Sequence, residues 1–226
     1  MMNWARPQFV ADLAPYYAGL AQVAGVHIWD HTGKISMPAA ARVQCVRASA
    51  DYGLYARFAM AALVDSDPVL LVDDDIRLPA QTIAGLLERW RACPQIVHGL
   101  IGRRPAGDGE YRRVTVSGRC PIILTRAAML SRALCAQTLA AGLRLLETAP
   151  GRPRGNGEDI VMSYTAMAAS RQLNCSCYGT LPFENIEERD GPEAICVRFP
   201  EHYEHRTRVI RWCRENIFDE RRLSRQ

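Results

Sequence analysis

The stretch VLLVDDDIRLP, residues 69–79, is the most informative part of this sequence. Its first four residues are all apolar, and such a short continuous run is typical of a strand buried on both faces. Three aspartates follow directly: Asp73, Asp74 and Asp75. Ligands of open α/β sheets bind just beyond the carboxyl ends of strands, and adjacent carboxylates repel one another unless a cation is near. The stretch therefore predicts a site for Mn²⁺ or Mg²⁺ that also holds phosphate oxygens, whereas the simpler interpretation is a solvated acidic turn.

Apolar periodicity on both sides of this stretch predicts alternating strands and helices. Strands are expected at residues 26–29, 69–72 and 96–100, over 112–124 with a break near Gly118, and at 173–178 and 194–199. Helices are expected from near Pro15 to residue 23, at 52–64, from Pro79 until Pro94 stops it, and at 127–146, 158–170 and 203–216. Residues 102–109 are expected to form a polar turn and 149–157 a break. The order βαβαβ in the first half predicts one α/β domain over residues 1–226, with a mixed, mostly parallel central sheet flanked by helices.

Composition limits the class of protein. The chain has 226 residues, of which 48% are hydrophobic and 23% charged, which excludes a wholly disordered chain or a coiled coil. No apolar run approaches the ~20 residues that span a bilayer, and the opening MMNWARPQF does not resemble a secretory signal. The net charge is 28 − 24 = +4, and Lys34 is the only lysine, a bias typical of GC-rich bacterial genomes. Nucleic acid is not an expected partner, because that interpretation would rest on arginine content alone.

The eight cysteines are scattered along the chain and include no C-x-x-C pair. The closest approach is Cys175-Ser176-Cys177, whereas a zinc site would need tight pairs of Cys, or of Cys and His. We interpret most of these cysteines as reduced, buried thiols. This predicts a cytoplasmic protein, in the cytosol or at the inner face of the membrane.

Two further groups of charged residues lie late in the chain. Glu158 and Asp159 begin a predicted helix, where the helix dipole alone would favour acidic residues. His202 and Arg206 lie four residues apart on the last helix and so share a face. An arginine there can neutralise the charge of a phosphate, and the simpler alternative is a solvated helix face.

Four segments together resemble the exostosin-type glycosyltransferase domain, glycosyltransferase family 64. In chain order they are LVDDDIRLP, GLLERWRACPQIVHGLIGRR, NGEDIVMSY and HYEHRTRVIRWC. The family's early Arg-Pro corresponds to Arg6-Pro7, and its arginine sixteen residues before the acidic triplet corresponds to Arg57 (73 − 57 = 16). The matches run from about residue 5 to residue 213. The resemblance implies a GT-A fold, with a nucleotide-binding half over about 1–100 and an acceptor half over about 101–226.

The resemblance also implies a nucleotide-sugar donor, a UDP-sugar, bound together with Mn²⁺ or Mg²⁺. On that basis Asp75 is the metal ligand, Asp74 contacts the donor sugar and Asp73 lies by the ribose. Arg6 and Arg57 line the nucleotide. The implied partners are therefore this donor and a carbohydrate or glycolipid acceptor.

The later residues receive catalytic roles from the same resemblance. Glu158 and Asp159 would face the donor sugar and the acceptor hydroxyl. Arg206, together with His202, would stabilise the diphosphate as it leaves. The family retains the anomeric configuration, so the implied mechanism is front-face attack in which the leaving diphosphate helps to take the acceptor proton.

The chain departs from the family pattern in several places. The family's Trp-Asn is Trp29-Asp30 here, its Asn-Cys is Asn156-Gly157, and the serine after the late arginine is Thr207. The family also has a strand just before Arg-Pro, where this chain has only residues 1–5.

Two alternatives therefore stay open. One is an inverting enzyme of the broad family-two type, with Asp159 as general base. The other is a non-catalytic nucleotide- or carbohydrate-binding module, which the short start favours. Residues 102–111 and 181–189 are expected on the acceptor side by position.

Overall fold

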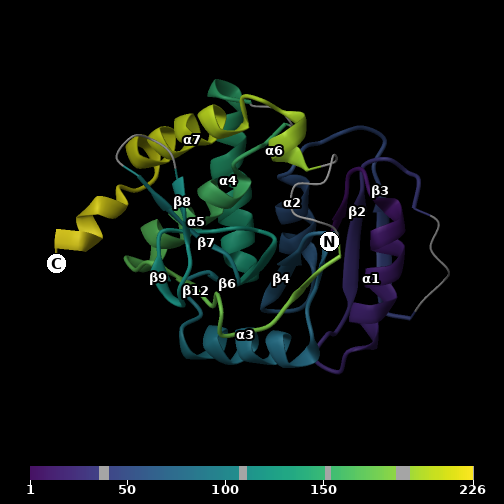
Figure 1. The fold of residues 1–226 in the computed structure, drawn as a ribbon. Coiled ribbons are helices and arrows are strands. Elements are labelled where there is room, and N and C mark those ends of the chain that lie inside the picture. Colours follow the sequence, from purple (N-terminus) through teal and green to yellow (C-terminus); the bar gives the residue numbers. More distant parts are fainter. Residues whose placement is uncertain (36–40, 107–110, 151–153, 187–193, 226) are drawn as a thin grey trace.

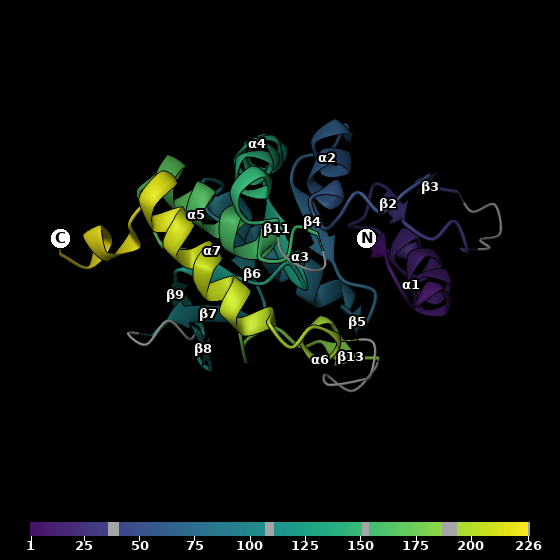
Figure 2. The same cartoon turned by 90° about the horizontal axis from the view of Figure 1, so that it is seen from above.

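The computed structural model describes residues 1–35, 41–106, 111–150, 154–186 and 194–225. It is an α/β fold in which the N-terminal helix and sheet lie at one end of the molecule and the C-terminus lies at the other (Figure 1). Helices surround the strands, as the sequence predicts, and α2 (Ala56–Leu63) and α4 (Arg132–Thr148) stand side by side (Figure 2).

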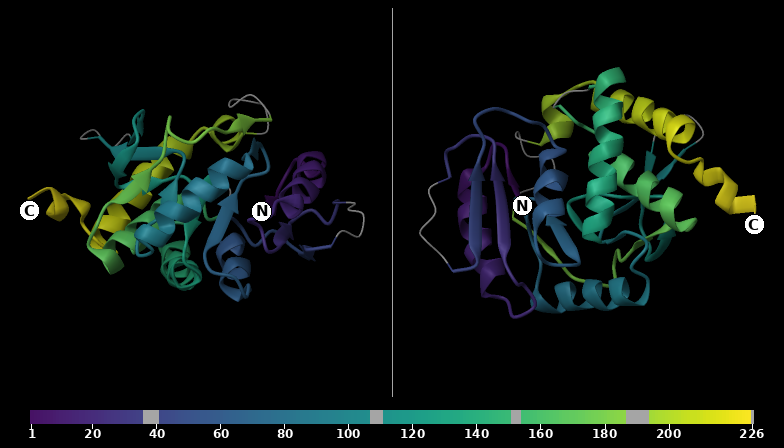
Figure 3. Two further views of the ribbon diagram at one scale, coloured as in Figure 1. Left: turned by 90° about the horizontal axis from the view of Figure 1, so that it is seen from below. Right: turned by 180° about the vertical axis from the view of Figure 1, so that it is seen from behind.

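The N-terminal end is a parallel three-stranded sheet with the order β1-β2-β3. Its strands are β1 (Met2–Asn3), β2 (Val26–Asp30) and β3 (Val43–Arg47). Met2 pairs with Trp29, so a short strand precedes Arg6-Pro7 in this chain as well. Figure 3 shows this sheet beside helix α1 (Pro7–Gly19).

Helix α1 begins eight residues earlier than predicted (15 − 7 = 8). Pro7 occupies the first turn, where a missing N–H leaves no hydrogen bond unmade. Pro15 lies inside the helix, although proline there removes a backbone hydrogen bond. The helix nevertheless continues because Leu13 and Tyr17 are buried against the sheet, so tertiary packing outweighs the local penalty.

A second sheet forms the centre of the molecule and has the order β4-β11-β6-β12-β9. Its strands are β4 (Val69–Val72), β11 (Ala127–Leu130), β6 (His98–Gly99), β12 (Asn174–Ser176) and β9 (Gly118–Cys120). Only β6 and β12 pair in parallel here, so the mostly parallel arrangement holds for the first sheet and not for this one. The reason is β11, which inserts antiparallel between β4 and β6.

The predicted helix 127–146 is therefore wrong at its start. Residues 127–130 form a buried strand, and α4 begins only after Ser131. The Ser131 hydroxyl accepts a hydrogen bond from the Leu134 backbone N–H at 3.2 Å, which is the usual cap of a helix N-terminus.

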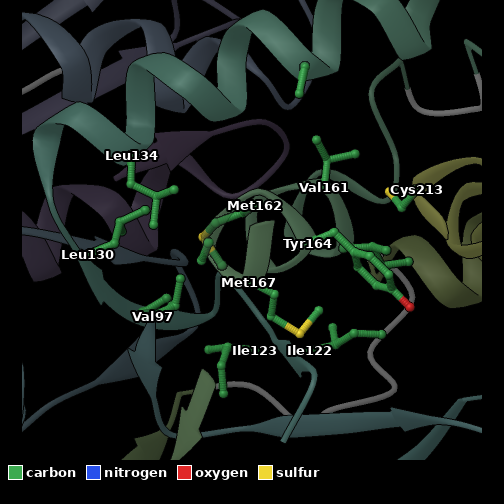
Figure 4. Packing of buried hydrophobic residues seen from close by; sticks show 14 of the residues in the cluster. Val97, Ile122, Ile123, Leu130, Leu134, Val161, Met162, Tyr164, Met167 and Cys213 are labelled. Atoms are coloured by element: carbon green, nitrogen blue, oxygen red, sulfur yellow. The ribbon is translucent and has the colours of Figure 1, made fainter. Parts of the chain in front are cut away.

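The central sheet separates two hydrophobic cores because strand side chains alternate between faces. On β4, Leu71 faces one core and Val72 the other, and on β11, Ala128 and Met129 do the same. One core contains residues of α2, α4 and α5 (Glu158–Ser170), and Figure 4 shows Val161, Met162 and Tyr164 of α5 within it. The other core contains residues of α1 and α3 (Ala80–Ala92). A cavity of about 440 Å³ is lined by residues of β1 and β2 on one side and of β4, α2 and α3 on the other.

The remaining elements extend these layers. A small antiparallel sheet consists of β7 (Gly102–Pro105), β8 (Tyr111–Val114) and β10 (Ile122–Ile123), and a two-stranded one pairs β5 (Ile76–Arg77) with β13 (Glu184–Asn185). The predicted polar turn at 102–109 is therefore partly strand, and residues 107–110 lie outside the described residues. The strand predicted at 194–199 is a single helical turn, α6 (Ile195–Arg198), because its hydrogen bonds run locally to Ala194 rather than to a neighbouring strand. The last helix is α7 (His202–Asn216), as predicted, followed by a 3₁₀ turn, Glu220–Arg225.

All eight cysteines are free, as expected, but only Cys120, Cys135, Cys177 and Cys213 are buried, which is half of them rather than most. Among the described residues, each helix is too short or too polar to cross a membrane.

Candidate active site

The two acidic groups predicted from the sequence lie close together in the structure. Arg57, near the N-terminus of α2, lies with Nη1 3.0 Å from Asp73 Oδ1 and 4.0 Å from Glu158 Oε1. Its side chain is buried, so this cation sits between the end of β4 and the start of α5. Residues about 85 positions apart (158 − 73 = 85) therefore share one charged partner.

The acidic triplet is held by two further arginines. Arg6 Nη2 lies 2.5 Å from Asp74 Oδ1, and its Nη1 lies 3.2 Å from Asp75 Oδ2. Arg126 donates from Nε to Asp75 Oδ1 at 3.1 Å. Because these carboxylates are paired and partly or fully buried, the interpretation as a solvated acidic turn is wrong.

Asp74 is the buried residue of the triplet. Burial raises the pKa of Asp74 from 3.8 to about 7, and the negative charges of Asp73 and Asp75 act in the same direction. The Arg6 guanidinium opposes this shift without cancelling it. Asp74 is therefore partly protonated near neutral pH, so its carboxyl group can donate a hydrogen bond as well as accept one.

Glu158 occupies the first position of α5, directly after Gly157. Gly157 has φ +93°, a left-handed conformation that favours glycine, and it turns the chain into the helix. The Thr125 hydroxyl donates to Glu158 Oε1 at 3.0 Å. Burial, followed by the charge of Asp159, raises the pKa of Glu158 from 4.5 to about 7, against the opposing effect of Arg57 and Arg206.

Arg206 of α7 lies against the neighbouring carboxylate. Its Nη2 is 2.6 Å from Asp159 Oδ1 and 2.5 Å from Oδ2, and its Nη1 is 3.3 Å from Asn156 Oδ1. Both charged side chains are about 5% exposed. The N-terminal part of α7 thus packs against the start of α5, and its interpretation as a solvated face is wrong for Arg206.

The two histidines of α7 also contact the residues just before α5. His202 Nδ1 lies 3.2 Å from Asn156 Nδ2, and His205 Nε2 lies 2.9 Å from the Asn156 carbonyl oxygen. Burial, followed by the positive charge of Arg206, lowers the pKa of His202 to about 4. His202 is therefore neutral at physiological pH, and it accepts the hydrogen bond from the Asn156 amide.

One expected acceptor segment lies beside the triplet. Within residues 181–189, β13 pairs with β5, and the Ile186 N–H donates to the Asp75 carbonyl oxygen at 2.9 Å. Residues 187–189 lie outside the described residues. The other expected segment, 102–111, contributes β7 and the start of β8, and its residues 107–110 are likewise outside the described part.

Sequence reasoning missed Thr125 and Arg126. Both precede β11, between the strand predicted to end at residue 124 and the helix predicted to begin at 127, where no motif marked a functional residue. The backbone explains their position: the Asp73 N–H donates to the Arg126 carbonyl oxygen at 3.0 Å, so the pairing of β4 and β11 brings this dipeptide to the triplet.

The chain as a whole matches a known family. The profile of the Glycosyl transferase family 64 domain matches residues 1–225, which places the protein among the glycosyltransferases, enzymes that move a sugar from a donor to an acceptor. More narrowly, the chain belongs to glycosyl transferase family 64. Membership of a family of enzymes argues against the alternative that the chain is a non-catalytic binding module. No curated protein matches the chain.

Proposed function

We propose that this glycosyltransferase is metal-dependent and moves a sugar from a UDP-sugar to a glycan or glycolipid acceptor, with retention of configuration. In this proposal the fold is of the exostosin-type GT-A class, with donor binding in about 1–100 and acceptor binding in about 101–226. The observation that supports it most is the position of Arg57 between Asp73 and Glu158. Because one buried cation joins the two acidic groups, a donor held by the triplet would have its reacting carbon near Glu158 and Asp159.

Asp75 is the proposed metal ligand, and its chemistry suits Mn²⁺ or Mg²⁺. It offers hard carboxylate oxygens at the end of a strand, with 16% of its side chain exposed. Among the described residues, no group of three or more His, Cys, Asp and Glu side chains is arranged to hold a metal. Mg²⁺ is usually held by one or two carboxylates together with substrate phosphates and water, so this sparse donor set fits a metal shared with a diphosphate. Such a metal stabilises the negative charge of a leaving diphosphate.

The donor would be bound by the residues around the triplet. Arg6 and Arg57 supply charged donors for the nucleotide, and Asp73 is placed by the ribose. Asp74 would face the donor sugar, where a partly protonated carboxyl group can donate to one sugar oxygen and accept from a hydroxyl.

The contacts of Asp159 favour retention over inversion. Both of its oxygens accept hydrogen bonds from Arg206, so the carboxylate is not presented as a free general base. In front-face attack the leaving diphosphate takes the acceptor proton instead. Glu158 and Asp159 then stabilise positive charge at the sugar carbon and orient the acceptor.

Arg206 has two roles in this proposal. It fixes the position of Asp159, and its charge stabilises the departing diphosphate. His202, which is neutral, keeps Asn156 and the start of α7 in place. The free cysteines suit a reducing compartment, and we therefore place the reaction in the cytoplasm.

Calorimetric titration tests the donor and metal assignments. UDP and GDP are titrated into the protein with and without Mn²⁺, and the titrations are repeated with Asp75→Asn and with Asp12→Asn, an exposed carboxylate of α1. We expect Mn²⁺-dependent binding of UDP that is lost in Asp75→Asn and kept in Asp12→Asn. Absence of nucleotide binding by the folded wild-type protein would contradict the proposal.

A further inference from the structure

Both carboxylate oxygens of Asp75 are in contact with arginine. Arg6 Nη1 lies 3.2 Å from Oδ2, and Arg126 approaches Oδ1 with Nε and Nη2, each at 3.1 Å. The three side chains are between 13% and 16% exposed. The residue proposed as the metal ligand is therefore already neutralised by the protein itself.

Arg126 is held beside Asp75 by the backbone rather than by chance contact of a long side chain. Its carbonyl oxygen accepts from the Asp73 N–H at 3.0 Å, which continues the pairing of β4 with β11. The preceding residue, Thr125, is tied to Glu158. The backbone therefore keeps Arg126 at the triplet whichever group its guanidinium binds.

The two nitrogens of Arg126 near Asp75 differ in their bonding. Nε donates a hydrogen bond to Oδ1, whereas the buried Nη2 lies 3.1 Å from the same oxygen without the alignment of a hydrogen bond and has no other hydrogen-bond partner among the described residues. A buried donor without an acceptor is unfavourable, and a guanidinium fork matches the oxygens of a phosphate group. Nη2 is consequently a donor that a diphosphate oxygen could satisfy.

A guanidinium group stays charged at all physiological pH values, so it cannot leave Asp75 by losing a proton. A divalent cation on Oδ1 would compete with Arg126 for the same oxygen and would be repelled by its charge. On the basis of the metal role proposed above, we infer that Arg126 is a positioning residue for Asp75. It holds Oδ1 in the structure, and with a divalent cation bound to Asp75 its guanidinium would instead be available to bind the donor diphosphate.

This inference predicts effects of opposite sign for two ligands. Arg126→Gln removes the competing charge, so Mn²⁺ alone binds about tenfold more tightly. The same change removes a diphosphate donor, so UDP at saturating Mn²⁺ binds about tenfold more weakly. A variant that was merely misfolded at the triplet would bind both ligands more weakly.

The test measures free Mn²⁺ by electron paramagnetic resonance and UDP binding by calorimetry. Arg126→Lys keeps the charge and is expected to retain the weak Mn²⁺ affinity of the wild type. Arg112→Gln, on exposed β8, makes the same chemical change outside the site and is expected to alter neither affinity.

The possible outcomes separate the role inferred for Arg126 from the metal site of the proposed function. Tighter Mn²⁺ binding with weaker UDP binding in Arg126→Gln supports the inference. Unchanged or weaker Mn²⁺ binding in Arg126→Gln, with the wild type binding Mn²⁺, overturns it and leaves the metal site in place. No Mn²⁺ binding by any folded variant overturns the metal part of the proposed function, and the inference with it.

Discussion

Arg206 contacts both oxygens of Asp159, at 2.6 Å and 2.5 Å, and this pair ties the last long helix to the start of α5. The two side chains are almost fully buried. Taking two charges out of water is unfavourable in itself, so the pair stabilises the fold only while both partners are present.

Removing one partner of this ion pair should therefore destabilise the fold strongly. We expect Arg206→Met to lower the free energy of unfolding by about 3–5 kcal/mol, because it leaves the Asp159 charge buried and unpaired. Denaturant unfolding measures this. Arg208→Met on the same helix breaks only the exposed pair with Glu204, and there we expect a loss of less than about 1 kcal/mol. Equal losses in the two variants would contradict the buried-pair account.

Gly157 should tolerate no side chain. Its φ of +93° strains any other residue, and an added Cβ would lie 3.0 Å from Val209 Cγ2. We expect Gly157→Ala to destabilise the protein by about 1–3 kcal/mol. Gly179→Ala is the matched control, since Gly179 also has positive φ (+75°) but nothing within 4 Å of an added Cβ. A loss no larger at Gly157 than at Gly179 would show that contact with α7 is unimportant.

The burial of Glu158 predicts a specific dependence of stability on pH. Its pKa is raised from 4.5 in the unfolded chain to about 7 in the folded protein. The folded state is therefore stabilised by the bound proton below about pH 4.5, and this stabilisation is lost as the pH rises through about 7. Glu158→Gln abolishes this titration.

Denaturant unfolding between about pH 5 and about pH 8 tests this dependence. The free energy of unfolding of the wild type, relative to Glu158→Gln, should fall as the pH rises. Glu215→Gln, an exposed change on α7, should show no such trend relative to the wild type. A difference between wild type and Glu158→Gln that is constant with pH would mean that Glu158 titrates normally.

The parts of the fold that were predictable are those in which local pattern and tertiary environment agree. The run before Asp73 is a strand whose last two residues are buried, and the helix that begins at Glu158 has acidic residues in its first turn, where the dipole favours them. The helix predicted at residues 127–130, Ala-Ala-Met-Leu, was wrong because alanine, methionine and leucine are strong helix formers in isolation. Their strand conformation follows from the neighbouring edges of β4 and β6, which no local pattern reveals.

The residues of the candidate site also include some that the sequence predicted and some that it did not. Asp73, Asp74 and Asp75 follow a strand end, and Glu158, Asp159 and Arg206 lie near helix starts, so these positions together with the family resemblance indicated where they gather. Thr125 and Arg126 reach the site only because β11 pairs with β4, and that pairing depends on segments more than 50 residues apart (127 − 72 = 55). Residues brought in by such non-local pairing carry no signature in a single sequence.

The most direct test of the account is the fate of a UDP-sugar incubated with the protein, followed by proton NMR. A panel of UDP-sugars is supplied with Mn²⁺, and the first-formed anomer of the transferred or released sugar is recorded before it mutarotates. The account predicts metal-dependent release of UDP from one donor, with the anomeric configuration of that donor retained, and loss of release in Asp75→Asn. Release that is independent of metal and of Asp75, or a first product with inverted configuration, would contradict it.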